Sequence, residues 1–152
     1  MSQDSARADA PFAAEIEIIQ IGEGLLACTL PKARWTHAAH FAAAVWILQR
    51  RPDIDAFVAM PGFIRAYNAA TGGVNSDGEG YHETITQASL RAARAFLAGL
   101  PAATPLHLAV NALLGSFLGR PDWLLEYWSR EMLFSVAARR TWIEPDLRAL
   151  VF

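Results

Sequence analysis

The chain has one cysteine, Cys28, among its 152 residues, so no disulfide can form within it. Proteins without disulfides are typical of a reducing compartment, and we expect a cytoplasmic location. Residues 1–12 lack the basic-then-apolar order of a signal peptide and are predicted to form a flexible tail. The longest apolar run, residues 41–48, is far shorter than the roughly 20 residues that span a bilayer, so no membrane partner is expected.

Positive charge is also scarce. The formal net charge is −2, and the basic residues occur as short pairs, at 50–51 and 139–140, instead of forming a stripe. This distribution excludes a nucleic-acid footprint. The glycine-rich stretch at 72–80 has neither the preceding strand nor the lysine of a phosphate-binding loop, so we expect no nucleotide cofactor.

What the chain does have is apolar helix-forming sequence. With 53% hydrophobic and 18% charged residues it is an ordinary globular chain, and we assign residues 13–152 to one all-α domain. Thr36 is a good N-cap for a helix that Pro52 ends, and between Ala38 and Leu48 only His40 is polar. A helix that is apolar on every side belongs inside a bundle, so the prediction is six or seven helices around this central one.

The other predicted helices surround this one in the sequence. We expect an early helix ended by Pro31, a third opened by Asp53 or Asp55 and kinked or split at Pro61, and a fourth over 81–97. Thr104 should cap the next, and two more should cover 121–134 and 135–143. The loop over 72–80 is predicted to be mobile and to act as a lid over the site.

Seven residues spread over three of these helices are predicted to be buried in the core: Ala42, Val45, Trp46, Leu48, Ile85, Phe96 and Leu113. The five tryptophans are typical of core or dimer contacts, which leaves a homodimer open.

Three of the four histidines fall in the opening turns of two core-facing helices. His37 and His40 are three residues apart and so share one face of the central helix. His82 begins the apolar stripe of the fourth helix, with Glu83 at the border of that stripe. We expect His40 and His82 to face each other across a small cavity, because each buried imidazole needs a partner.

The stretches "LPKARWTHAAHF", "YNAATG", "GYHETIT" and "WIEPDL" carry a resemblance to a known group. Together they resemble a family of small, mostly bacterial helical proteins with an H-x-x-H helix start and a Tyr-His-Glu-Thr-Ile-Thr motif. The family is uncharacterised and implies no activity. The resemblance implies only that His37, His40 and residues 81–84 belong to one pattern.

Three interpretations of this pattern remain open. The first is metal-dependent small-molecule chemistry, with His37, His40 and His82 holding a divalent zinc or iron ion. Two facts oppose it: H-x-x-H alone is a weak signal, and the adjacent His82 and Glu83 point about 100° apart on a helix. Whether the protein is an enzyme is left open, with a metal-dependent enzyme favoured.

The second interpretation is a metal-free acid–base enzyme or a binder of an anionic small ligand. Helix N-termini favour negative charge and keep imidazoles neutral, so Glu83 could act as base, His82 as electrophile or relay, and Tyr81 as hydroxyl donor. The third is a structural or protein-interaction cluster, in which Gly80 caps the fourth helix and Glu83 bonds back to it.

Overall fold

A computed structural model describes residues 10–152 and shows a single bundle of seven α-helices, labelled α2 to α8, with three short 3₁₀ helices, η1 to η3. Within this part of the chain there is no β-strand. The predicted all-α class and helix number are confirmed. Residues 1–9 of the predicted tail lie outside the described part. Phe12, which we assigned to the tail, is held in the domain by two hydrogen bonds between its backbone and the Asn111 side chain.

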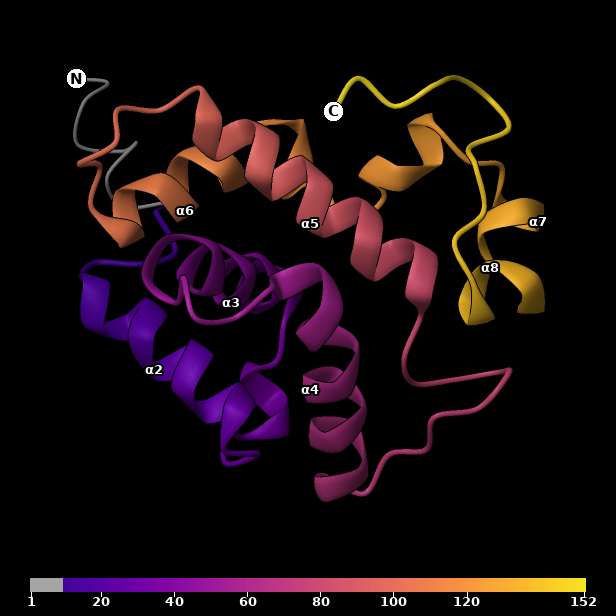
Figure 1. The fold of residues 1–152 in the computed structure, drawn as a ribbon, viewed down its shortest axis with the longest axis horizontal. Helices are drawn as coiled ribbons and strands as arrows, with labels where there is room; N and C mark the ends of the chain where they lie inside the picture. Colours follow the sequence, from indigo (N-terminus) through magenta and orange to yellow (C-terminus); the bar gives the residue numbers. More distant parts are fainter. Residues whose placement is uncertain (1–9) are drawn as a thin grey trace.

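The central helix is α3 (His37–Arg50), and Figure 1 shows it enclosed by the other long helices. Residues 41–47 are all buried, as the apolar pattern predicts. The Thr36 hydroxyl accepts a hydrogen bond from the Ala39 N–H and caps the helix, also as predicted. On one side α3 packs against α2 (Glu15–Leu26), where Gly22 lets the ring of Trp46 come so close that a Cβ at this position would clash.

Two helices of similar length complete the wall around the candidate site. One is α4 (Ala56–Ala70), capped by Asp55 and continuous through Pro61, so of the predicted kink or split at this proline, the split is wrong. The other is α5 (Glu83–Ala98), which crosses the bundle diagonally and packs on both α3 and α4 (Figure 1). The α6 helix (Leu106–Gly115) covers another side of α3.

Three predicted helix boundaries are wrong, each for a local reason. The early helix ends at Leu26 and not at Pro31, because Cys28 adopts the left-handed conformation, with φ 58°, that stops a helix. The N-cap of α5 is His82, not Gly80. The Thr104 hydroxyl donates to the Pro101 carbonyl instead of capping α6, whose first N–H donates to the Glu15 carboxylate.

The C-terminal third is less helical than predicted. The segment 121–134 was expected to form one helix, but it contains η3 (Trp123–Glu126) and the single turn α7 (Arg130–Leu133). Ser129 separates the two, because its backbone and hydroxyl both bond the Asp146 carboxylate and its hydroxyl then caps α7. The last helix is α8 (Val136–Arg140). These short pieces and the end of the chain lie together beside α5 (Figure 1).

The core agrees with the prediction in part. Ala42, Val45, Trp46 and Leu113 are buried, whereas the other three predicted core residues, Leu48, Ile85 and Phe96, are only partly buried. Ile85 is partly open because it lines a cleft, described next. Over residues 10–152, no helix is both long enough and apolar enough to cross a membrane.

Candidate functional site

A cleft of about 440 Å³ opens between the start of α3, the first half of α5 and the η3–α7 region. Its volume lies within the range of small-molecule sites, and most of its walls are apolar or aromatic. Its polar members are His37, His40, Ser89, Asp122 and Arg130. The apolar lining comprises Phe41, Ile85, Pro121, Trp123, Leu124, Leu125, Leu133 and Phe134.

His40 is the best-oriented polar group in the cleft. Its Nδ1 lies 2.6 Å from the carbonyl oxygen of Thr36, one turn earlier on the same helix. A carbonyl can only accept, so Nδ1 carries the hydrogen and the neutral ring has its lone pair on Nε2. The His40 ring also stacks on Trp35, with 3.8 Å between centroids and 28° between planes. The Thr36 carbonyl and the Trp35 ring, which forms a platform under the imidazole, together hold it in one orientation.

The Trp35 platform is itself anchored. It follows η1 (Lys32–Arg34), and its ring meets Tyr67 of α4 edge-on at 5.4 Å between centroids. The Tyr67 hydroxyl donates to the Leu30 carbonyl at 2.8 Å, and Tyr67 is buried. Burial raises the pKa of the Tyr67 phenol, and the nearby Cys28 raises it further, so the phenol stays a donor. Residues from three segments therefore fix the position of His40.

The surroundings of His40 favour its neutral form. The ring is exposed to solvent, yet it lies in a concave surface among many protein atoms. This environment lowers the pKa of His40, the hydrogen bond to Thr36 acts in the opposite direction, and His37 lowers the pKa further. At neutral pH, Nε2 is then unprotonated, it has no hydrogen-bond partner within the described residues, and His40 lines the cleft. Such a nitrogen can accept a hydrogen bond or a proton from a ligand.

His37 has a second oriented imidazole at the same helix start. Its Nε2 lies 2.9 Å from the Leu118 carbonyl in η2 (Phe117–Gly119), so Nε2 donates and the lone pair of the neutral ring is on Nδ1. The ring packs edge-on against Phe41 at 5.3 Å between centroids. His37 thus joins η2 to α3 and also lines the cleft.

A smaller cavity of about 50 Å³ adjoins the cleft. His40, Ile85 and Ser89 line both spaces and so form the boundary between them. The rest of this smaller cavity, called the annex below, is lined by the apolar residues Trp35, Ala44, Met60, Ile64 and Leu90 and by Thr86. Its volume has room for a methyl-sized group or a water molecule, not for the body of a ligand.

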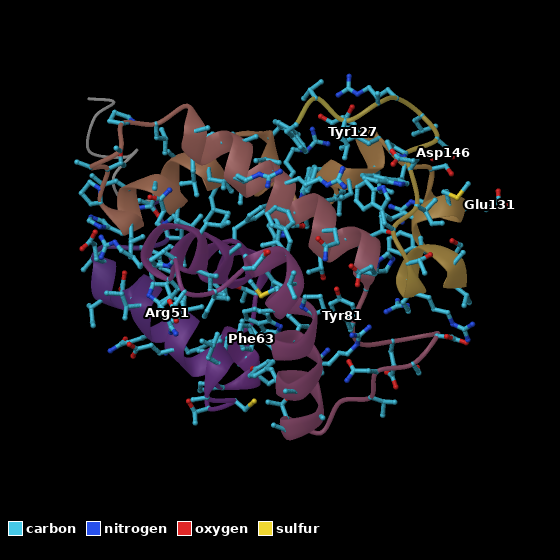
Figure 2. All side chains as sticks on the ribbon, viewed as in Figure 1. Arg51, Phe63, Tyr81, Tyr127, Glu131 and Asp146 are labelled. Atoms are coloured by element: carbon cyan, nitrogen blue, oxygen red, sulfur yellow. The ribbon has the colours of Figure 1, made fainter. Side chains whose placement is uncertain are left out.

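The start of α5 uses its polar groups differently. The Tyr81 hydroxyl donates to Glu83 Oε2 at 2.8 Å, so the structure does bring these two predicted residues together. Tyr81 is buried, and the guanidinium of Arg65 lies 4.3 Å above its ring. Burial, followed by Glu83, raises the pKa of the Tyr81 phenol well above its usual range. Figure 2 shows Tyr81 between α4 and the start of α5.

Both ring nitrogens of His82 are occupied by backbone groups. Nδ1 accepts from the Ile85 N–H at 3.2 Å, which makes His82 the N-cap, and Nε2 donates to the Leu133 carbonyl at 2.7 Å. The side chain is 7% exposed. Burial lowers the pKa of His82, and Arg139 lowers it further, whereas the Leu133 carbonyl, the backbone of His82 itself and Glu83 act in the opposite direction. His82 therefore connects α5 to α7 and lies outside the cleft lining.

Thr84 makes a second connection from the same turn. Its hydroxyl donates to the Thr141 carbonyl at 2.9 Å and accepts from the Ile143 N–H at 3.2 Å, and the residue is fully buried. Arg139 adds hydrogen bonds from its guanidinium to the carbonyls of Gly80 and Tyr81. The crowded polar turn "GYHETITQ" thus attaches the C-terminal region to α5.

The predicted metal ligands do not form one group. His37 and His40 line the cleft together, but His82 is engaged by Ile85 and Leu133. Within residues 10–152 no three His, Cys, Asp or Glu side chains are arranged to hold a metal ion. The expectation that His40 and His82 share a cavity is likewise not supported by the cleft lining. A zinc or iron site remains a prediction without an assembled ligand set.

The cleft and the smaller cavity beside it include functional candidates that sequence analysis missed. Trp35, Ser89 and Arg130 come from three separate segments, and nothing local in the sequence relates them. Ser89 was recognisable on the apolar stripe of its helix, but only as a small core residue. For Arg130 the only signal was a charge in an aromatic-rich stretch.

The loop at 72–80 lines neither the cleft nor the annex, so the structure does not support its predicted role as a lid. It is anchored through Asn75, whose side-chain oxygen accepts from the Tyr81 N–H and from Asn68, and whose amide donates to the Arg65 carbonyl. Gly80 has φ +86°, and a Cβ there would clash with the Val74 carbonyl. The conformation of this loop holds Tyr81 in place.

Comparison of the chain with protein-family models, with curated proteins and with solved structures finds no match.

Proposed function

We propose that the cleft binds a small, mainly apolar molecule that donates a hydrogen bond to His40, and that His40 acts as an acid–base group on that donor. The observation that carries the proposal is the state of the His40 ring. Nδ1 donates to the Thr36 carbonyl, the ring stacks on Trp35, Nε2 has no hydrogen-bond partner within the described residues, and His40 lines the cleft. This proposal is the metal-free interpretation, but the acid–base residue is His40 at the start of α3 instead of Glu83 or His82 at the start of α5.

The chemistry follows from the lone pair on Nε2. A neutral imidazole accepts a hydrogen bond from a hydroxyl, a phenol or an amide N–H, and it can take the proton of a weakly acidic group. When His40 takes that proton, its Nδ1–H bond to Thr36 remains and stabilises the imidazolium. His37 provides a second acceptor in the same wall. The apolar walls supply most of the binding energy, and the imidazoles orient the ligand.

The metal-dependent alternative has narrower support. Two imidazoles in one wall, each with a nitrogen not bonded to the backbone, could provide two ligands to a divalent ion. A third protein ligand would have to come from elsewhere, because His82 is engaged by backbone groups.

The single cysteine continues to support a cytoplasmic location.

Phenol and anisole test the proposal as a matched pair of probes, because anisole keeps the ring and the oxygen but lacks the donor. We expect phenol to perturb the nitrogen resonances of His40 in an NMR titration and to bind about tenfold more tightly than anisole, the usual value of one good hydrogen bond. The His40→Ala variant should lose this preference. His107→Ala is the control, since His107 lies on α6 and does not line the cleft.

Equal binding of phenol and anisole, or an unchanged preference in His40→Ala, would overturn the proposal. A parallel titration with Zn²⁺ separates the metal-dependent alternative. Binding of Zn²⁺ that is lost in both His37→Ala and His40→Ala, in a protein that does not prefer phenol, would establish that alternative instead.

A further inference from the structure

Arg130 adds a positive charge to the lining of the cleft. It lines the cleft and is exposed, and within the described residues it forms no ion pair with an Asp or Glu. The only other charged residue in the lining, Asp122, lies 3.3 Å from Arg120, which offsets its charge. The cleft thus holds one guanidinium with donors available to a ligand.

Building on the proposed function, we propose that the ligand is a small aromatic carboxylate with a hydroxyl or N–H donor at its far end. Its carboxylate pairs with Arg130, and its donor group reaches His40. A guanidinium is well suited to a carboxylate because its parallel N–H groups match the two oxygens. The neutral imidazole of His40 is suited to the donor end of the ligand, because Nε2 can accept a hydrogen bond. It carries no charge, so it would not compete with Arg130 for the carboxylate.

The sizes of the two spaces determine where the body of the ligand can lie. The annex behind His40 is too small for a ring, so the body of the ligand must lie in the larger space. There it meets aromatic walls from Phe41, Trp123 and Phe134. Phe41 and Trp123 are buried and lie 6.5 Å apart between ring centroids, so this part of the wall is fixed. Aromatic side chains of this kind favour an aromatic ring in the ligand.

The test uses 4-hydroxyphenylacetate and its neutral amide, which have the same length and the same hydroxyl. We expect the carboxylate to bind about tenfold more tightly than the amide by titration calorimetry, as a charge-assisted contact predicts. In Arg130→Gln the two probes should bind equally, with the amide affinity unchanged. Arg94→Gln is the matched control, because it removes the same charge from the part of α5 outside the cleft.

Two further variants sharpen the assignment. Arg130→Lys should retain part of the preference, since it keeps the charge and loses the paired geometry. Asp122→Asn should strengthen binding of the carboxylate, because it removes a negative charge from the lining.

The outcomes separate the two proposals. If the preference for phenol over anisole depends on His40 but the carboxylate binds no more tightly than the amide, the inference about Arg130 is overturned and the proposed function stands. If Arg130→Gln weakens both probes equally, Arg130 shapes the cleft and does not recognise an anion, which also overturns the inference. If no probe shows any dependence on His40, the proposed function itself fails.

Discussion

The starts of α3 and α5 carry the same kinds of residues and use them in opposite ways. At α3, one ring nitrogen of His37 and one of His40 donate to backbone carbonyls, and both residues line the cleft. At α5, His82 gives both ring nitrogens to the backbone. Each α3 histidine therefore has one ring nitrogen without a backbone partner, whereas His82 has none.

The difference comes from which partners reach each turn. The Thr36 hydroxyl caps α3, and His40, four residues later, lines the cleft. No Ser, Thr or Asp caps α5, and His82 takes that role itself. The C-terminal region then covers α5 and provides the carbonyls of Leu133 and Thr141. His82 is therefore used as a helix cap, whereas His37 and His40 are not.

The largest expected effect is loss of stability in His82→Ala. This change removes the cap of α5 and leaves the buried Leu133 carbonyl without its donor, so we expect a cost of about 2–4 kcal/mol. Urea unfolding measures it. His82→Asn keeps an N-cap oxygen and loses only the Leu133 contact, so it should fall between the wild type and His82→Ala. A cost below about 0.5 kcal/mol for His82→Ala would break the comparison between the two helix starts.

The next effect concerns the second connection from α5. Thr84→Val keeps the shape of the side chain but removes a hydroxyl that donates to Thr141 and accepts from Ile143. We expect a loss of about 1–3 kcal/mol, because two buried backbone groups lose their partner. Hydrogen exchange should speed up first at residues 141–147. Thr141→Val is the control, since its exposed hydroxyl bonds only the end of its own helix.

Stability should also depend on pH through His82. Its folded pKa is lowered, so its contribution is complete above the unfolded value of about 6.5 and is lost as the pH falls below it toward the folded value. The slope for one such group is about 1.4 kcal/mol per pH unit. Urea unfolding from pH 7.5 to 5.5 measures this slope. His82→Asn should show a flatter profile, and an unchanged slope in that variant would assign the dependence to other groups.

The smallest expected effect is the stability change in His40→Ala. Its ring is exposed, and the Thr36 carbonyl still accepts from the His40 backbone N–H after the ring is removed. We expect a loss below about 1 kcal/mol by urea unfolding, while binding of phenol is lost. A loss as large as that of His82→Ala would make His40 structural as well, and the contrast between the two helix starts would disappear.

Local patterns predicted the helices well where a cap or an apolar run decided them. Thr36 and Asp55 are caps in the structure, and the apolar run of α3 is buried. Prediction failed where a distant residue decided the outcome. Asp146 interrupts the expected helix at Ser129, and Glu15 replaces Thr104 at the start of α6.

The sequence by itself determined the all-α class, the central position of α3 and the presence of histidines in the first turns of two helices. These properties depend on residues within one or two turns of each other, where spacing and capping operate. Only the tertiary structure decided which histidines line the cleft and which one bonds the backbone through both ring nitrogens. The Leu133 carbonyl that binds His82 lies 51 residues away in the chain. Bonds across such separations depend on the packing of the whole bundle, and no local pattern in the sequence encodes them.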